Sequence, residues 1–222
     1  MNLEAMIRQY RVAAHDTVEP YFFADDDLIP LFNEAQHEAV TRGRLIHEAQ
    51  DPAVCEIAVT AGQAVYPLHP ALYELTHIRL EQQGSHRSQS IRLSSTEELD
   101  SVFPQWREIT GRPEYAVQDD TALRLVPIPE ADGTLKVEGY RLPLSEMTDV
   151  ADEPEINAAH HRHLHQWVLF RVFSVPDAEV FDPSRAALAE SEFTRYFGLR
   201  QDSDLRRIVR EDEPHHVKAF FV

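Results

Sequence analysis

The stretch DPAVCEIAVTAGQAVYPL, residues 51–68, decides the fold of this chain because the spacing of apolar residues changes within it. Before this stretch the apolar residues recur every three or four positions, which is typical of amphipathic helices. From Cys55 to Val59 every second residue is apolar, which is typical of a strand. The small residues Ala61-Gly62 then predict a turn into a second strand, residues 65–68, so that the stretch forms a hairpin.

Two helices are predicted before this stretch. The first covers Leu3 to Ala14, where Asn2 is placed to cap the first turn. The second follows Asp25, Asp26 and Asp27, whose negative charges suit the positive end of a helix, and runs to about Ala49. Pro30 is compatible with this helix because the amide positions of a first turn have no intrahelical partner.

Further strands are predicted downstream of the first two, separated by turns that contain Gly, Pro and Asp. They cover residues 75–80, 90–93, 114–118, 123–127 and 134–142. A short helix, residues 96–102, is expected among them, with Ser95 as its cap. Strands of this kind joined by short turns predict a compact antiparallel sheet or sandwich.

Helical spacing returns after Asp152. Residues 164–175 are apolar on nearly every side, which predicts a helix that other elements cover from several directions. Asp182-Pro183 predicts the start of a further helix, since it combines an N-cap with proline at the first helical position, and Gly198 predicts its end. Residues 199–222 are charged and weakly patterned, and they end in the apolar tip KAFFV, which we expect to be an interaction arm.

These patterns predict an α+β fold, with a helical bundle body formed by both ends of the chain and an inserted antiparallel β domain. We assign residues 1–50 and 153–210 to the discontinuous helical body, residues 51–152 to the β-rich insertion and residues 211–222 to a C-terminal arm. The two helical parts must therefore meet in space. The side chains expected to pack between helices or between subunits are Leu31, Phe32, Leu164, Trp167, Phe170, Phe173, Phe193 and Phe197.

Charge and cysteine content restrict the range of functions. The 222 residues include 38 acidic and 21 basic side chains, a net charge of -17 that opposes binding to the phosphates of nucleic acids. Such acidity usually serves solubility; the alternative is a surface past which DNA slides. The single cysteine, Cys55, excludes an internal disulfide framework and any site with several cysteine ligands.

The N-terminal residues lack a basic segment followed by an apolar one, and no run approaches the roughly 18 apolar residues of a membrane span. We therefore expect a protein that is made and kept in the cytosol, without a membrane role.

Four histidines between residues 160 and 165 form the one cluster that suggests metal chemistry. His161 and His165 lie four residues apart and would share one face of a helix, as paired zinc ligands do. The glutamate of an H-E-x-x-H motif is missing, and zinc would need two further ligands. We favour a solvated histidine cluster at an interface, with no metal and no cofactor; the alternative is a metal-dependent hydrolase.

The sequence contains no nucleophile motif and no phosphate-binding loop, so we expect no catalytic residues and no enzymatic activity. The segment Ser85 to Ser95, with His86, Arg87 and Arg92, could form a loop for an anionic ligand, although a solvated loop and edge strand is favoured. The basic residues Arg206, Arg207 and Arg210 either meet an acidic partner surface or a phosphate, or belong to a solvated helix end balanced by residues 211–213.

Four segments, taken in their order and spacing, resemble the head-to-tail adaptor proteins of tailed bacteriophages. Each segment is degenerate by itself, and the resemblance covers most of the chain. The segments are PYFFADDDLIPLFNEAQHEA (20–39), AGQAVYPL (61–68), LRLVPIP (123–129) and EPEINAAHHRHLHQW (153–167).

This resemblance implies a virion structural protein at the head-tail interface, assembled in the host cytoplasm into a dodecameric ring. It implies the portal protein, tail or nozzle proteins and further copies of the chain as partners, with genome DNA only in passage through the ring. It also implies a C-terminal arm that reaches the portal through apolar anchors. The arm residues would be Val217, Lys218, Phe220, Phe221 and Val222. A soluble scaffold or binding module outside the virion is the remaining alternative.

Overall fold

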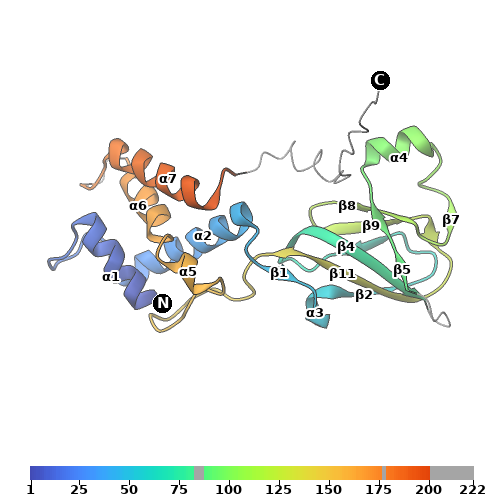
Figure 1. Cartoon of the computed structure of the whole chain (residues 1–222), viewed down its shortest axis with the longest axis horizontal. Helices are drawn as coiled ribbons and strands as arrows, with labels where there is room; N and C mark the ends of the chain where they lie inside the picture. The colour runs from blue at the N-terminus through green and yellow to red at the C-terminus, as the bar shows by residue number, and fades with distance from the viewer. Residues whose placement is uncertain (83–87, 177–178, 201–222) are drawn as a thin grey trace, which may run out of the picture. The chain divides into compact units, whose positions relative to one another are not determined.

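The computed structural model describes residues 1–82, 88–176 and 179–200 (Figure 1). Within this part of the chain, contacts define two compact units. The helical unit contains residues 1–48 and 140–200, and the β unit contains residues 49–139. Helices and strands are thus combined as the predicted α+β class requires.

The helical unit is built around one central helix. Its helices are α1 (Leu3–Ala14), α2 (Asp25–Gly43), α5 (Ala158–His161), α6 (His165–Phe173) and α7 (Pro183–Phe197). Helix α6 packs against α1, α2 and α7, which explains why nearly all its sides are apolar (Figure 1). The predicted caps of α1 and α7 are confirmed: Asn2 accepts a hydrogen bond from the N–H of Ala5, and Asp182 accepts from Ser184 and Arg185.

Helix α2 begins and ends earlier than its pattern predicted. It begins at Asp25, so that Pro30 lies inside the helix and removes one intrahelical hydrogen bond. It ends at Gly43, because Arg44 adopts a left-handed backbone conformation with φ of 49° and donates its N–H to the carbonyl of Val40. Leu45 and Ile46 fit the helical spacing but lie beyond this cap, before the two-residue strand β1 (His47–Glu48).

Polar side chains attach the segment after residue 140 to residues 1–48. The buried Asn33 amide donates to the carbonyl of Met147 at 2.8 Å and accepts from the N–H of the same residue at 2.9 Å. Buried Arg141 forms ion pairs with Glu48 at 3.0 Å and Glu155 at 2.6 Å. These bonds explain why the contact boundary falls between residues 139 and 140, upstream of residue 152.

The β unit consists of strands in two sheets around one core. The first sheet contains β2 (Glu56–Val59), β4 (Leu72–Gln82), β5 (Gln89–Ser90) and β11 (Gly133–Arg141). The second contains β3 (Val65–Pro67), β6 (Arg92–Leu93), β8 (Tyr115–Gln118) and β9 (Ala122–Val126). Both sheets contribute side chains to one buried cluster, including Ile78, Leu80, Leu135, Ala116, Leu123 and Leu125.

Short elements complete the β unit. Strands β7 (Thr110–Gly111) and β10 (Ile128–Pro129) form a separate pair, and α3 (Pro52–Cys55) is a one-turn helix before β2. Helix α4 (Thr96–Val102) has the predicted bounds, with the Ser95 hydroxyl accepting from the N–H of Glu98. Its cap therefore identified this helix correctly from the sequence.

The predicted hairpin within residues 51–68 is wrong. Strand β2 pairs with β11, whereas β3 pairs with β9, so the two strands belong to different sheets. Gly62, with φ of 81°, donates its N–H to the carbonyl of Pro129 at 2.7 Å, which ties the connection to a distant segment. The sheets are also mixed and not purely antiparallel, because β6 pairs in parallel with β8 and β7 with β10.

Candidate interaction surfaces

The histidines predicted as metal candidates are buried. His161 is 2% exposed, and its Nε2 lies 2.9 Å from the carbonyl of Ile156 while its Nδ1 lies 3.0 Å from the amine of Met1. His165 is 9% exposed, and its Nδ1 lies 2.8 Å from the carbonyl of Arg162. The two residues belong to α5 and α6, respectively, so the expected shared helix face does not form. The prediction of a solvated cluster is wrong for both, because their rings bond to the main chain.

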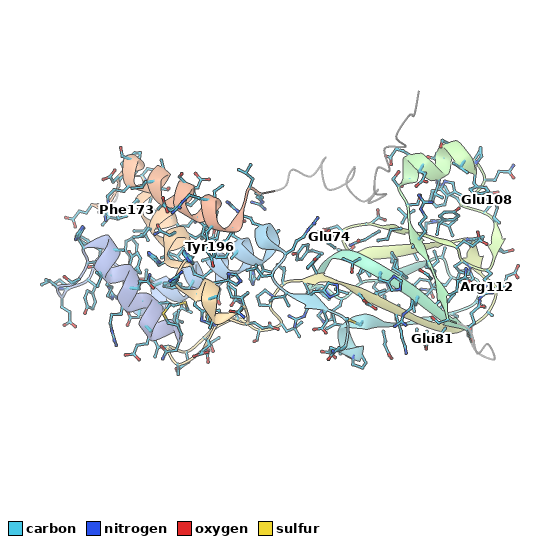
Figure 2. The ribbon with its side chains drawn as sticks, in the orientation of Figure 1. Glu74, Glu81, Glu108, Arg112, Phe173 and Tyr196 are labelled. Atoms are coloured by element: carbon cyan, nitrogen blue, oxygen red, sulfur yellow. The ribbon has the colours of Figure 1, made fainter. Side chains whose placement is uncertain are left out.

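The other two histidines of this segment are half-buried and form a basic aromatic surface with α7. The ring of His163 stacks on that of Tyr196 (labelled in Figure 2), with centroids 3.6 Å apart. Nδ1 of His160 lies 3.2 Å from the Tyr196 hydroxyl. Burial lowers the pKa of both imidazoles, and the positive charge of Arg162 lowers that of His163 further. These rings are therefore mainly neutral at pH 7. The exposed positive charge comes from Arg162, and from Arg195, which is paired with Glu192.

Across residues 1–82, 88–176 and 179–200, no group of three or more His, Cys, Asp or Glu side chains is arranged to hold a metal ion. None of the helices in these ranges combines the length and apolar character needed to cross a membrane.

An open groove of about 660 Å³ lies along α2 in the helical unit, next to residues 146–148. Its lining combines apolar and acidic side chains: Ile29, Pro30 and Met147 on the one hand, and Asp26, Glu34, Glu38 and Glu146 on the other. His37 also lines it, with Nε2 3.1 Å from a carboxylate oxygen of Glu146. We call this feature the α2 groove; its chemistry suits a ligand that is both basic and apolar.

The connection between α1 and α2, residues 15–24, is held by a buried charge. The guanidinium of Arg11 lies 2.9 Å from the carboxylate of Asp16, and both side chains are less than 10% exposed. The same guanidinium lies 3.6 Å from the centroid of the Tyr21 ring. Asp16 also accepts a hydrogen bond from the N–H of Phe22, whose side chain is 56% exposed. The loop thus presents an apolar side chain from a fixed backbone.

The eight predicted packing residues all lie in the helical unit. Phe32, Leu164, Trp167, Phe173, Phe193 and Phe197 are buried, whereas Leu31 and Phe170 are half-buried. The Trp167 ring lies 5.0 Å from that of Phe170 and 5.1 Å from that of Phe193. Packing between helices of one subunit accounts for these positions, and packing between subunits stays a prediction.

Other predicted residues lie outside the described part of the chain. These are Ser85, His86 and Arg87, the basic residues Arg206, Arg207 and Arg210, and the arm residues Val217, Lys218, Phe220, Phe221 and Val222. In the described portion of the serine-rich segment, Arg92 and Ser94 both contact Glu98, which is the arrangement of an ordinary ion-paired loop.

The sequence of the chain matches a known protein family. The model of the SU10 adaptor protein family matches residues 1–214. The chain belongs to this family. The match spans the segments that carried the resemblance, and it confirms the chain as a phage head-to-tail adaptor, a structural protein of the virion. No curated protein matches the chain.

Proposed function

We propose that this adaptor forms a ring that docks on the portal, connects it to the tail and surrounds the path of the leaving genome. The observation that supports the proposal is the family match over residues 1–214, which includes both structural units and part of the C-terminal segment. The ring is taken to be a dodecamer, and its further partners are tail or nozzle proteins. The proposal involves no chemistry on a substrate, only assembly by complementary surfaces.

Exposed apolar residues of the helical unit support assembly with other copies. A closed ring needs two different complementary faces on each subunit. Val18 and Phe22 are 76% and 56% exposed in the loop between α1 and α2, and Leu188 is 65% exposed on α7. Side chains of this size gain free energy when a neighbouring subunit removes them from water.

The acidic excess supports a role beside passing DNA. With 38 acidic and 21 basic residues, the chain repels phosphates on average, so DNA can move past it without being held. Any basic surface must therefore be local, as the one around Arg162 and Arg195 is.

The C-terminal arm is proposed to bind the portal through Phe220 and Phe221. Deleting residues 211–222 should leave a folded protein that no longer joins portal-bearing heads, because the apolar anchors are lost. Co-sedimentation with such heads measures joining, and circular dichroism checks the fold. The double variant Phe220→Ala/Phe221→Ala should fail in the same way, whereas Lys218→Ala should bind more strongly than this double variant. If the truncated chain joined portal-bearing heads as the full chain does, the proposal that the arm binds the portal would be refuted.

A further inference from the structure

We propose that the α2 groove is the docking site of this chain's own segment 205–210, which would attach the base of the C-terminal arm to the helical unit. The segment, LRRIVR, lies outside the described residues, and its sequence is the basis of the assignment. This inference goes beyond the adaptor function and requires neither the ring nor the portal.

The chemistry of the segment complements that of the groove. Residues 205–210 contain three arginines, three aliphatic residues and no acidic residue, which is unusual in a chain with net charge -17. The groove offers Ile29 and Pro30 to the aliphatic side chains, and the carboxylates of Asp26, Glu34 and Glu146 to the guanidinium groups. Arginine suits such a site because its planar group donates several hydrogen bonds to carboxylates and its stem covers apolar surface.

The described chain ends at the groove. Arg200, the last described residue, places its Nη1 3.3 Å from a carboxylate oxygen of Glu38, which lines the groove. An extended chain covers roughly 3.3 to 3.6 Å per residue, so Arg206 can lie up to about 20 Å from Arg200. Asp26 and Glu38 are separated along α2 by about 18 Å at 1.5 Å per residue. The segment can therefore reach the full length of the groove.

Carboxylates remain available for the incoming arginines. Glu34 is paired with Arg171, and Glu38 with Arg42 and Arg200. In the described part of the chain, the salt bridge of Glu146 is with His37 alone, and Asp26 has none. Exposed ion pairs are individually weak and are screened by salt, so docking depends on several pairs acting together with the aliphatic contacts.

The docked segment would be protected from trypsin, which cleaves after arginine. We expect the full chain to be cut after Arg206, Arg207 and Arg210 more slowly than a synthetic peptide of residues 199–214. In the triple variant Asp26→Asn/Glu34→Gln/Glu146→Gln the cleavage should accelerate roughly tenfold, because the groove loses three of the negative charges that attract the arginines. Mass spectrometry of early time points measures each site, and none of the cleaved positions is altered by the substitutions.

A matched control changes the same charge elsewhere. Glu97, Glu108 and Glu130 are exposed acids of the β unit (Glu108 is labelled in Figure 2), and the variant Glu97→Gln/Glu108→Gln/Glu130→Gln should leave cleavage at the wild-type rate. Equal rates in the groove variant and the wild type would overturn the proposal. Equal acceleration in both triple variants would also overturn it, because the effect would then come from net charge.

Two further measurements use the wild-type chain, so they stand even where the groove variant fails to fold. Protection relative to the peptide should fall in about 1 M salt, where ion pairs are screened over about 3 Å; no protection at low salt would overturn docking. Protection should not depend on protein concentration, because the site and segment belong to one chain. If protection from trypsin rose with protein concentration, docking within one chain would be wrong and the segment would bind a second copy. Neither outcome alters the portal test, which concerns residues 211–222.

Discussion

The helical unit and the β unit use charged side chains in opposite ways. In the helical unit, Arg11 and Arg141 are at most 8% exposed and bond to carboxylates from distant parts of the sequence or from a loop. In the β unit, Lys136 forms partly exposed ion pairs with Glu56 and Glu81 across neighbouring strands. Buried pairs fix the course of the backbone, whereas exposed cross-strand pairs mainly keep a sheet face in water.

This difference matters for an adaptor. The helical unit joins two parts of the chain that are almost 100 residues apart in sequence, so it needs specific polar bonds to define one arrangement. The helical unit also carries the exposed features described above. These are the loop of residues 15–24, the basic aromatic surface and the α2 groove. The buried apolar residues of the β unit form two clusters, one with side chains from both sheets and one that includes Leu99 of α4.

The largest expected effects come from the two cores. Phe193→Ala should lower the stability of the helical unit by about 3 to 5 kcal/mol, and Ile78→Ala that of the β unit by about 2 to 5 kcal/mol, because both side chains are fully buried. Amide hydrogen exchange should show the loss of protection mainly in the unit that carries the change. Equal losses in both units for either variant would contradict the division into separate cores.

A comparable effect is expected from the buried charge of α1. Arg11→Met should cost about 3 to 5 kcal/mol, because it leaves Asp16, 3% exposed, without its cation. Arg8 on the same helix makes an exposed pair with Glu4, so Arg8→Met should cost no more than about 1 kcal/mol. Chemical denaturation measures both values. Equal costs for the two variants would show that burial is not what separates them.

Acid should weaken the helical unit through Glu155. Burial raises the pKa of this carboxyl, but hydrogen bonds from Arg141 and from the N–H of Leu144 outweigh burial and lower the pKa below its usual 4.5. A lowered pKa means that the ionised form is favoured in the folded state. The stability it provides is therefore complete above about pH 4.5 and is lost as the pH falls through the folded-state pKa.

The variant Glu155→Gln separates this contribution from other acid effects. It should be less stable than the wild type at pH 7, and the difference should shrink as the pH falls below 4.5. Thermal unfolding across this pH range measures the difference. Glu138→Gln, which alters a long, exposed pair with Arg79, should show little pH-dependent difference. A constant deficit of Glu155→Gln at every pH would contradict the ion pair with Arg141.

The smallest effect is expected on the sheet face. Lys136→Met should change the stability of the β unit by no more than about 1 kcal/mol, because both its ion pairs are exposed to solvent and screened by salt. Denaturation at low and high salt checks this value. A loss comparable to that of Arg11→Met would remove the distinction between the units.

Local signals in the sequence predicted several elements correctly. The caps Asn2, Ser95 and Asp182 located α1, α4 and α7, because capping is decided by a few neighbouring residues. The apolar residues on nearly all sides of α6 predicted its central position, since α1, α2 and α7 pack against it. The family resemblance also came from the sequence alone.

Features that depend on distant partners were not predictable in the same way. The connection of five residues between β2 and β3 was taken for a hairpin turn, although tight hairpins usually have two residues, and its length was the available signal. The ring of His161 bonds to the main-chain carbonyls of Ile156 and Met1, and no local sequence pattern indicates these partners. The α2 groove needs Glu146 and Met147 beside α2, more than 100 residues away in sequence.

The central claim, that the chain is a ring-forming adaptor on the portal, is tested most directly by electron microscopy of the purified protein mixed with the portal of the same phage. The account predicts a closed ring of copies of this chain added to the portal on its rotation axis. A portal that gains no density, or that binds isolated copies away from the axis, would contradict it.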